Sequence, residues 1–183
     1  MVAYVGMDLR QDVEWVDAQS YDAMMPSFID GQADAVLAFP PQPQDLRAQK
    51  IGRVIVNTAQ DRPWAQYFCC MVAARKDFVA NKPVATKRAV RAILKAADIC
   101  AREPERAARY MVAKGYEPRY DVALEVVNAV SYNRWRTYDP DDSLRFFGVR
   151  LHEVGMIKTS PLKLIAQGTD WRFLTELKRE LKG

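Results

Sequence analysis

The chain has 183 residues, of which 49% are hydrophobic, 27% charged and 10% aromatic. This composition supports a folded domain with a buried core and excludes a disordered polymer. The 27 Lys and Arg residues nearly balance the 23 Asp and Glu residues, leaving a net charge of +4. The basic residues between 87 and 109 lie off the apolar stripe of a predicted helix, which indicates a solvated face rather than a nucleic-acid-binding surface. No apolar run is long enough to span a bilayer.

The first 80 residues alternate between strand-like and helix-like patterns. Apolar runs rich in β-branched and aromatic residues predict strands over 13–17, 33–39, 54–56 and 67–74. Ser20 is expected to cap a helix that ends at Ile29, and a short helix is expected around Leu46. This rhythm is typical of an α/β fold, in which helices cover a sheet. We expect Cys69 and Cys70 to be reduced, buried thiols in the last of these strands.

From Pro83 onward the pattern is helical. The ends of these helices are indicated by three kinds of residue. Proline marks the first position of a helix, glycine follows the last position, and Asp139 is an expected N-cap. The predicted helices share apolar residues at i, i+3 and i+4 and cover 83–103, 104–115, 120–130, 139–154 and the chain from 171 onward.

The residue types provide no persuasive catalytic or metal-binding constellation. His152 is the only histidine, and helix packing explains its position. The eight glycines are scattered, so no phosphate-binding loop is present. The acidic residues at 139, 141 and 142 are explained by helix capping. We therefore expect a chain that is not an enzyme and that carries no cofactor and no metal.

Binding residues are better represented than catalytic ones. Ligands of α/β folds lie at the loops beyond strand ends and at the helix N-termini there. Three such places predict a ligand site built from Ser20, Tyr21, Phe39, Pro40, Arg62 and Trp64. A structural explanation is equally open for each, with Ser20 only a cap, Trp64 ordinary core and Arg62 half of a surface ion pair.

Several of these segments, taken together with others in chain order, resemble the motifs of a known protein family. In chain order they are Gly6-Met7-Asp8, Gly31 to Ala35, Phe39-Pro40-Pro41, Asp61-Arg62-Pro63-Trp64, Ala74 to Val79, and Pro83 followed by a long Ala-rich helix. Together they resemble the substrate-binding proteins of nitrate/sulfonate/taurine-type ABC transporters, a group that includes binders of thiamine-pyrimidine precursors. The resemblance covers nearly the whole chain and implies a two-lobed periplasmic-binding-protein-like fold that holds its ligand between the lobes.

Compared with that plan, the chain is expected to be truncated at its N-terminus. Residues 1–65 would be part of the second lobe, and residues 66–183 the return crossing strand with C-terminal helices that pack on the first-lobe side. A full-length family member would be periplasmic. No signal peptide is visible here, so this chain is expected to stay in the cytoplasm.

The resemblance implies a solute-binding component of an ABC importer for a small polar or anionic molecule, with a transporter permease as its partner. Loss of one lobe would leave Trp15, Phe39, Trp64 and Phe68 near an exposed side, so a homo-oligomer is expected. Two alternatives are an enzyme similar to thiamine-pyrimidine synthases and the effector-sensing domain of a transcription regulator. The enzyme would need a cysteine-rich motif with a reactive histidine, and the regulator a DNA-reading helix-turn-helix.

Overall fold

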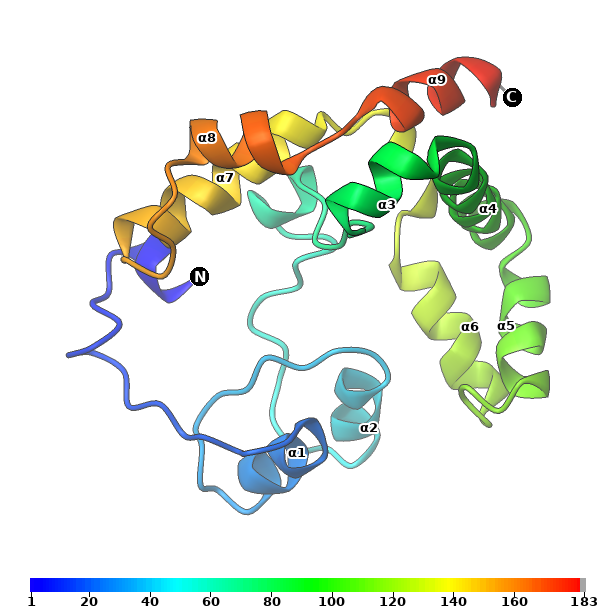
Figure 1. The fold of residues 1–183 in the computed structure, drawn as a ribbon. Helices are drawn as coiled ribbons and strands as arrows, with labels where there is room; N and C mark the ends of the chain where they lie inside the picture. Colours follow the sequence, from blue (N-terminus) through cyan, green and yellow to red (C-terminus); the bar gives the residue numbers. More distant parts are fainter. Residues whose placement is uncertain (182–183) are drawn as a thin grey trace.

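The computed structural model describes residues 1–181, and their regular structure consists of helices only (Figure 1). The α-helices are α1 (Tyr21–Ile29), α2 (Gln42–Ala48), α3 (Lys76–Asn81), α4 (Pro83–Arg102), α5 (Pro104–Ala113), α6 (Tyr120–Ala129), α7 (Pro140–Glu153), α8 (Pro161–Gly168) and α9 (Arg172–Glu180). Short 3-10 helices are η1 (Val2–Val5), η2 (Trp64–Gln66) and η3 (Tyr132–Arg136). No helix in this part of the chain is long and apolar enough to cross a membrane.

The predicted α/β fold class is wrong, because residues 1–181 contain helices and no strand, so their fold class is all-α. The predicted strands over 13–17, 33–39, 54–56 and 67–74 run as irregular chain instead. A strand exists only where a neighbour pairs with its N–H and C=O groups. Within residues 1–181 no backbone group of these segments forms such a bond with another of them. The sheet of a two-lobed binding-protein fold is therefore not formed, and the expected boundary between residues 65 and 66 stays a prediction.

The helix boundaries follow the predicted caps closely. The Ser20 hydroxyl accepts a hydrogen bond from the backbone N–H of Ala23 at 3.1 Å and begins α1. The Asp139 carboxylate accepts from the N–H groups of Asp141 and Asp142 at 2.9 and 3.1 Å and begins α7. Pro83 is the first residue of α4. These predictions are confirmed because a cap satisfies backbone donors within its own turn and needs no distant partner.

The helix α4 is the centre of the C-terminal part of the molecule. It contacts α3, α5, α6, α9 and η3, while α7 packs along α8 (Figure 1). The fully or nearly fully buried apolar side chains lie mostly on these elements: Leu94, Ala108, Ala123, Val127, Phe173 and Leu177. On α4 the predicted apolar stripe is only partly buried, since Leu94 is buried whereas Ile93 is half exposed. The core is therefore small for a chain of this length.

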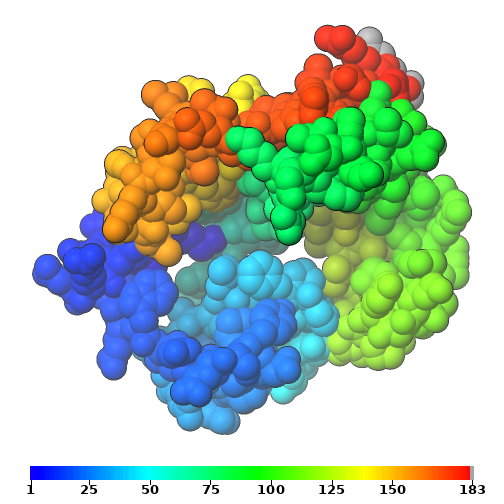
Figure 2. Space-filling view, viewed as in Figure 1, coloured from blue at the N-terminus to red at the C-terminus, as the bar shows by residue number. Residues whose placement is uncertain are grey.

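The helices α1 and α2 lie apart from this core. Figure 2 shows an opening between the segment that carries them and the helices α7 and α8. Gly52 has a φ of +66°, and a Cβ there would lie 2.9 Å from the Phe28 ring, so only glycine lets this turn pack against α1. Ion pairs tie α2 to α6 and the loop before it, with Arg47 bound to Glu125 at 2.7 Å and Asp45 bound to Arg119.

A buried carboxylate joins three elements of the core. Asp98 of α4 is 7% exposed and accepts hydrogen bonds from the guanidinium of Arg136 and, at 3.2 Å, from the indole N–H of Trp135. Arg136 also donates to the carbonyl of Leu181, just after α9, at 3.2 Å. The hydrogen bonds from the Arg136 guanidinium hold the pKa of Asp98 below its ordinary value. The Trp135 N–H lowers this pKa further, by a smaller amount. This junction links α4, η3 and the end of α9.

We expect this pair to make stability fall at low pH. A carboxyl whose pKa is lower in the folded state stabilises the fold above its unfolded pKa, about 3.9, and loses that contribution as pH falls through the folded pKa. The urea midpoint should therefore decrease as the pH is lowered from 5 toward 2. The variant Asp98→Asn should be less stable at pH 7 and show a flatter pH profile.

The control is Asp34→Asn, since Asp34 is exposed and forms no ion pair among residues 1–181. It should retain the steep profile of the unmodified protein. Equal pH profiles for Asp98→Asn and the unmodified protein would contradict the role assigned to the junction.

Candidate functional site

A hollow of about 200 Å³ lies between the segment after η2 and the helix α7. Its lining residues are Tyr67, Asp142, Arg145, Phe146, Val149 and Arg150. Five of these six come from α7 at spacings of three and four residues, so one face of a single helix presents them. This hollow is the candidate functional site, and we refer to it below as the α7 hollow.

The floor of the α7 hollow is aromatic. The Tyr67 and Phe146 rings stack with centroids 4.0 Å apart and planes inclined by 14°. Phe147 meets both rings edge-on, at 5.2 Å from Phe146 and 6.3 Å from Tyr67. Stacked and edge-on aromatic pairs are worth roughly 0.5–1.5 kcal/mol beyond the burial of their area. The floor is therefore a preformed apolar surface.

The rim of the α7 hollow is predominantly basic. Two guanidinium groups, Arg145 and Arg150, face one carboxylate, Asp142. Arg150 is paired with Glu153 at 2.7 Å, and its guanidinium also lies over the Tyr4 ring at 5.8 Å. Arg145 forms no ion pair with any residue of the described chain, so its five donors are available. A planar guanidinium beside an aromatic surface suits a small anion or a polar group with two acceptor atoms.

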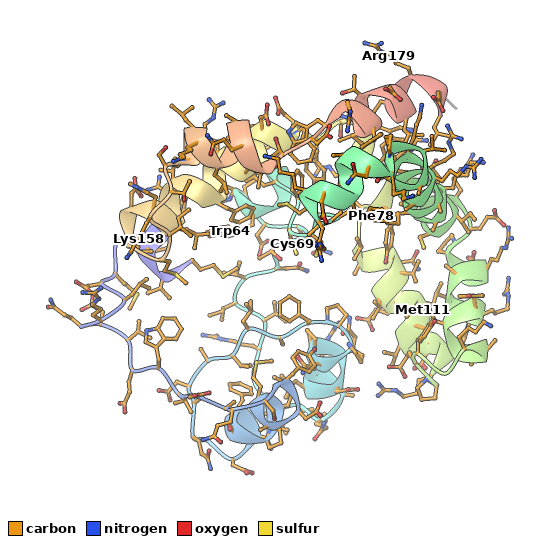
Figure 3. All side chains as sticks on the ribbon, in the orientation of Figure 1. Trp64, Cys69, Phe78, Met111, Lys158 and Arg179 are labelled. Carbon is orange, nitrogen blue, oxygen red and sulfur yellow. The ribbon has the colours of Figure 1, made fainter. Side chains whose placement is uncertain are left out.

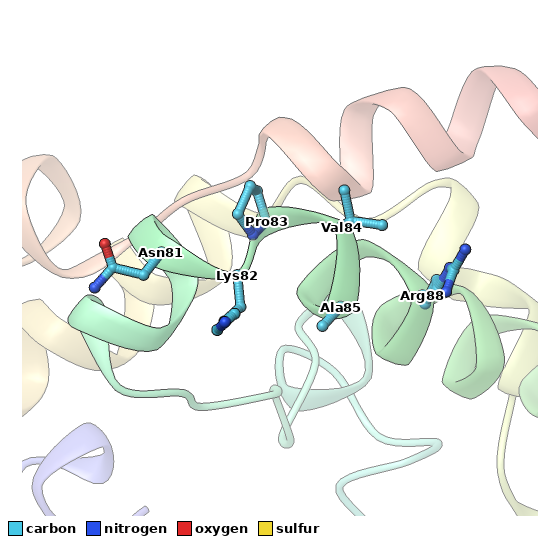
Figure 4. A pocket seen from close by; sticks show the side chains of 6 residues that line it. All are labelled: Asn81, Lys82, Pro83, Val84, Ala85 and Arg88. Atoms are coloured by element: carbon cyan, nitrogen blue, oxygen red, sulfur yellow. The ribbon is translucent and has the colours of Figure 1, made fainter.

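A second hollow, of about 500 Å³, lies at the beginning of α4. It is lined by Asn81, Lys82, Pro83, Val84, Ala85 and Arg88, which are close neighbours in the sequence. Figure 4 shows that these side chains point in different directions, so their polar groups do not converge on one point. Recognition of a small molecule needs a few polar groups aimed at the same place. The α7 hollow therefore is the better candidate.

Of the six predicted ligand-binding residues, Trp64 contacts a residue that lines the α7 hollow. Trp64 contacts Phe146 edge-on at 5.7 Å and Tyr4 at 5.1 Å, and it is partly buried (Figure 3). Arg62 is exposed two residues earlier in the chain. Trp64 therefore has a packing role, and a ligand-binding role for it stays a prediction.

The other four predicted residues lie in the segment of α1 and α2. Ser20 caps α1 and Tyr21 is its first residue, while Phe39 and Pro40 precede α2. Figure 3 labels Trp64 beside α7, away from the segment of α1 and α2. The structure does not gather all six residues into one site, and their role in binding stays a prediction.

Arg145 and Phe146 were not identified from the sequence. The apolar spacing predicted a helix over 139–154, but it did not indicate that Arg145 and Phe146 would line a site. Nothing local to α7 indicates that Tyr67 stacks on it, because the two residues are far apart in the sequence. Only the tertiary structure brings them together.

The cysteines Cys69 and Cys70 and the histidine His152 are not among the residues that line the α7 hollow. Cys69 and Cys70 are exposed rather than buried, so the expected core position is wrong. They are free thiols whose sulfurs share a hydrogen bond at 3.2 Å. The contact with Cys70, followed by partial burial, raises the pKa of Cys69 to about 11, which keeps it a thiol at neutral pH. His152 is exposed near the end of α7. Among residues 1–181 no three His, Cys, Asp or Glu side chains gather as a metal site would require.

We expect Trp64→Ala to lower the melting temperature, because it removes the edge-on contacts with Tyr4 and Phe146. The loss should be smaller than the roughly 3–5 kcal/mol of a fully buried tryptophan, since Trp64 is only partly buried. Thermal unfolding followed by circular dichroism measures it. The matched control is Trp15→Ala, whose side chain is exposed and should be nearly neutral. Equal losses for the two variants would contradict the packing role of Trp64.

A family model supplies the comparison with known proteins. The model of the NMT1-like family matches residues 1–115. No curated protein and no solved structure matches the chain. The match confirms at the level of the family the resemblance to ABC-transporter substrate-binding proteins. Because the matched segment is more than half of the 183 residues, the chain belongs to the NMT1-like family.

Proposed function

We propose that this chain is the solute-binding component of an ABC importer for a small polar or anionic molecule, and that it works with the permease of that importer. The observation that carries the proposal is the NMT1-like family match over residues 1–115. The basic rim and aromatic floor of the α7 hollow support the class of ligand.

The dimensions of the α7 hollow favour a small solute. Its volume of about 200 Å³ is less than the roughly 300–1,000 Å³ of pockets that hold drug-sized ligands. The Arg145 guanidinium would bind two oxygens of a carboxylate, sulfonate or nitrate group. The carbon atoms of the solute would lie on the Tyr67–Phe146 stack. Binding of this kind forms and breaks no covalent bond, so the solute is released unchanged.

We expect small oxyanions to raise the melting temperature in a thermal-shift screen of nitrate, sulfonates, carboxylates, pyrimidines and neutral sugars. A ligand that binds only the folded state stabilises it by mass action. Mass spectrometry of the recovered ligand should show no chemical change. A response to the neutral sugars alone would contradict the ligand class, and conversion of the ligand to a product would favour the enzyme alternative.

The variant Arg145→Gln tests the site directly. It removes the guanidinium and its charge from the rim of the α7 hollow and leaves a shorter, neutral, polar side chain. Hydrogen bonds to charged groups are worth about 1.5–3 kcal/mol, so we expect the Kd of the best oxyanion to rise roughly 10-fold or more in calorimetry.

The control for this variant is Arg109→Gln. Arg109 is an exposed helical arginine of α5, outside both hollows, and its replacement removes the same charge. Its Kd should equal that of the unmodified protein. If both variants weaken binding equally, the effect is one of net charge and the α7 hollow is not the site.

A further inference from the structure

Two neighbouring cysteine side chains, Cys69 and Cys70, lie together at the surface of the described chain. Both are free and exposed, and their sulfur atoms share a hydrogen bond at 3.2 Å. The side chains of consecutive residues in a strand would point to opposite faces. Here the chain bends at Cys69 and brings both sulfurs to one side. The two thiols therefore form a bidentate pair, which can bind one atom from two positions.

The aromatic residues just before the pair hold this part of the chain in place. Tyr67 stacks on Phe146 of α7 with ring centroids 4.0 Å apart. Phe68 meets the ring of Tyr138 edge-on at 6.1 Å. The bend at Cys69 thus follows directly on two residues that are packed against the helical body. Such positioning lowers the entropic cost of bringing two ligand atoms to one point.

A disulfide between the two sulfurs would be strained. The Cα atoms of consecutive residues are about 3.8 Å apart across a trans peptide bond, whereas the Cα atoms of disulfide-bonded residues are usually about 4.4–6.8 Å apart. A strained disulfide is easily reduced. The hydrogen bond with Cys70 also raises the pKa of Cys69 to about 11, and the thiolate is the form that oxidises readily. Both properties favour the reduced pair.

The distance between the sulfurs selects the kind of atom that can bridge them. With bonds to sulfur of about 2.3 Å, an atom that holds two sulfurs at about a right angle keeps them about 3.3 Å apart. This separation matches the 3.2 Å between the sulfurs of Cys69 and Cys70. A tetrahedral ion would need them about 3.8 Å apart, and a linear ion about 4.6 Å apart. The pair therefore suits a centre whose bonds are nearly perpendicular.

The number of ligands narrows the choice further. A structural zinc ion takes four ligands from Cys, His, Asp and Glu side chains. Within residues 1–181 no three such side chains gather. Trivalent arsenic is a soft centre that prefers sulfur, and its lone pair keeps its three bonds nearly perpendicular. Its third bond goes to a hydroxyl group or to carbon, so two protein sulfurs are sufficient.

We propose that Cys69 and Cys70 form a binding site for trivalent arsenic, supplied as arsenite or as an organic arsenical. Each thiol replaces one hydroxyl group on arsenic. An S–H bond and an As–O bond break, an As–S bond forms, and the proton leaves with the hydroxyl group as water. Two waters are released and arsenic stays trivalent, so no oxidant or reductant takes part. Neither cysteine lines the α7 hollow, so the site does not depend on the proposed solute-binding function.

Native mass spectrometry with phenylarsine oxide tests the proposal on the reduced, ligand-free chain. The expected result is one adduct per chain, in which one phenylarsenic unit replaces two hydrogens. A dithiol competitor should remove the adduct, because it offers arsenic the same two sulfurs in one molecule. A monothiol at the same concentration should leave the adduct in place. Absence of the adduct, or its removal by the monothiol, would overturn the proposal.

Three matched variants locate the site. Cys69→Ser and Cys70→Ser each leave one sulfur of the pair, whereas Cys100→Ser removes the partly buried cysteine of α4 and leaves the pair intact. We expect the Kd of phenylarsine oxide to rise roughly 100-fold or more in the first two variants, because the second sulfur no longer binds within the same molecule. The Kd should stay unchanged in Cys100→Ser.

Circular dichroism of the three variants verifies that each keeps its helices. Equal Kd values for the three variants and the unmodified protein would overturn the proposal. A loss confined to Cys100→Ser would place the arsenic at another thiol and would overturn it as well.

Discussion

The buried Asp98–Arg136 pair is the interaction on which the arrangement of the C-terminal helices depends. A charge removed from water is tolerated only when it is paired and hydrogen-bonded, so Arg136 must reach α4 from the chain between α6 and α7. Arg136 thereby fixes the position of the chain just before α7. A second polar contact holds α7 itself, because the indole N–H of Trp171, beside the start of α9, donates a hydrogen bond to Asp141 of α7 at 2.7 Å. The face of α7 that lines the candidate site is positioned by these polar contacts as much as by apolar burial.

The segment of α1 and α2 is held by weaker forces. Its ties to α6 are ion pairs with exposed side chains, and such pairs typically contribute about 0–1 kcal/mol. Few apolar side chains of this segment are buried, and its strand-like runs are unpaired. The N-terminal third of the chain thus has the sequence of a sheet and lacks the neighbours that make one. This lack of pairing neighbours explains both the large accessible surface and the all-helical architecture of residues 1–181.

The α7 hollow is lined by one residue inside the segment that the family model matches and by five residues outside it. Tyr67 lies within the segment matched by the NMT1-like family model, whereas α7 lies beyond residue 115. The stack of Tyr67 on Phe146 is the contact that joins them. The proposed solute would therefore contact both parts, Tyr67 of the matched segment and the lining face of α7.

The sequence by itself determined most of the helices and their ends. An N-cap or a proline at the first helical position acts within a single turn, so it could be predicted without knowledge of the fold. The N-caps are Ser20 and Asp139, and the first-position prolines are Pro83 and Pro104. The helices α3 and α8 were not predicted, although Ser160 caps α8 by the same local chemistry. The family relation was also predicted from the order of short motifs. Among the six candidate ligand-binding residues, Trp64 is the one for which the structure shows a contact with the lining of the α7 hollow.

Only the tertiary structure decided whether the strand-like segments become strands and where the candidate site lies. An apolar, β-branched run favours strand conformation, but it becomes a strand only when another segment pairs with its backbone N–H and C=O groups. Residues 1–181 contain no segment that pairs with these runs. The stack of Tyr67 on Phe146 likewise depends on two distant segments that meet only after the helices have packed. Local hydrogen bonds can be predicted from neighbouring residues, whereas long-range contacts depend on which surfaces the whole chain leaves available.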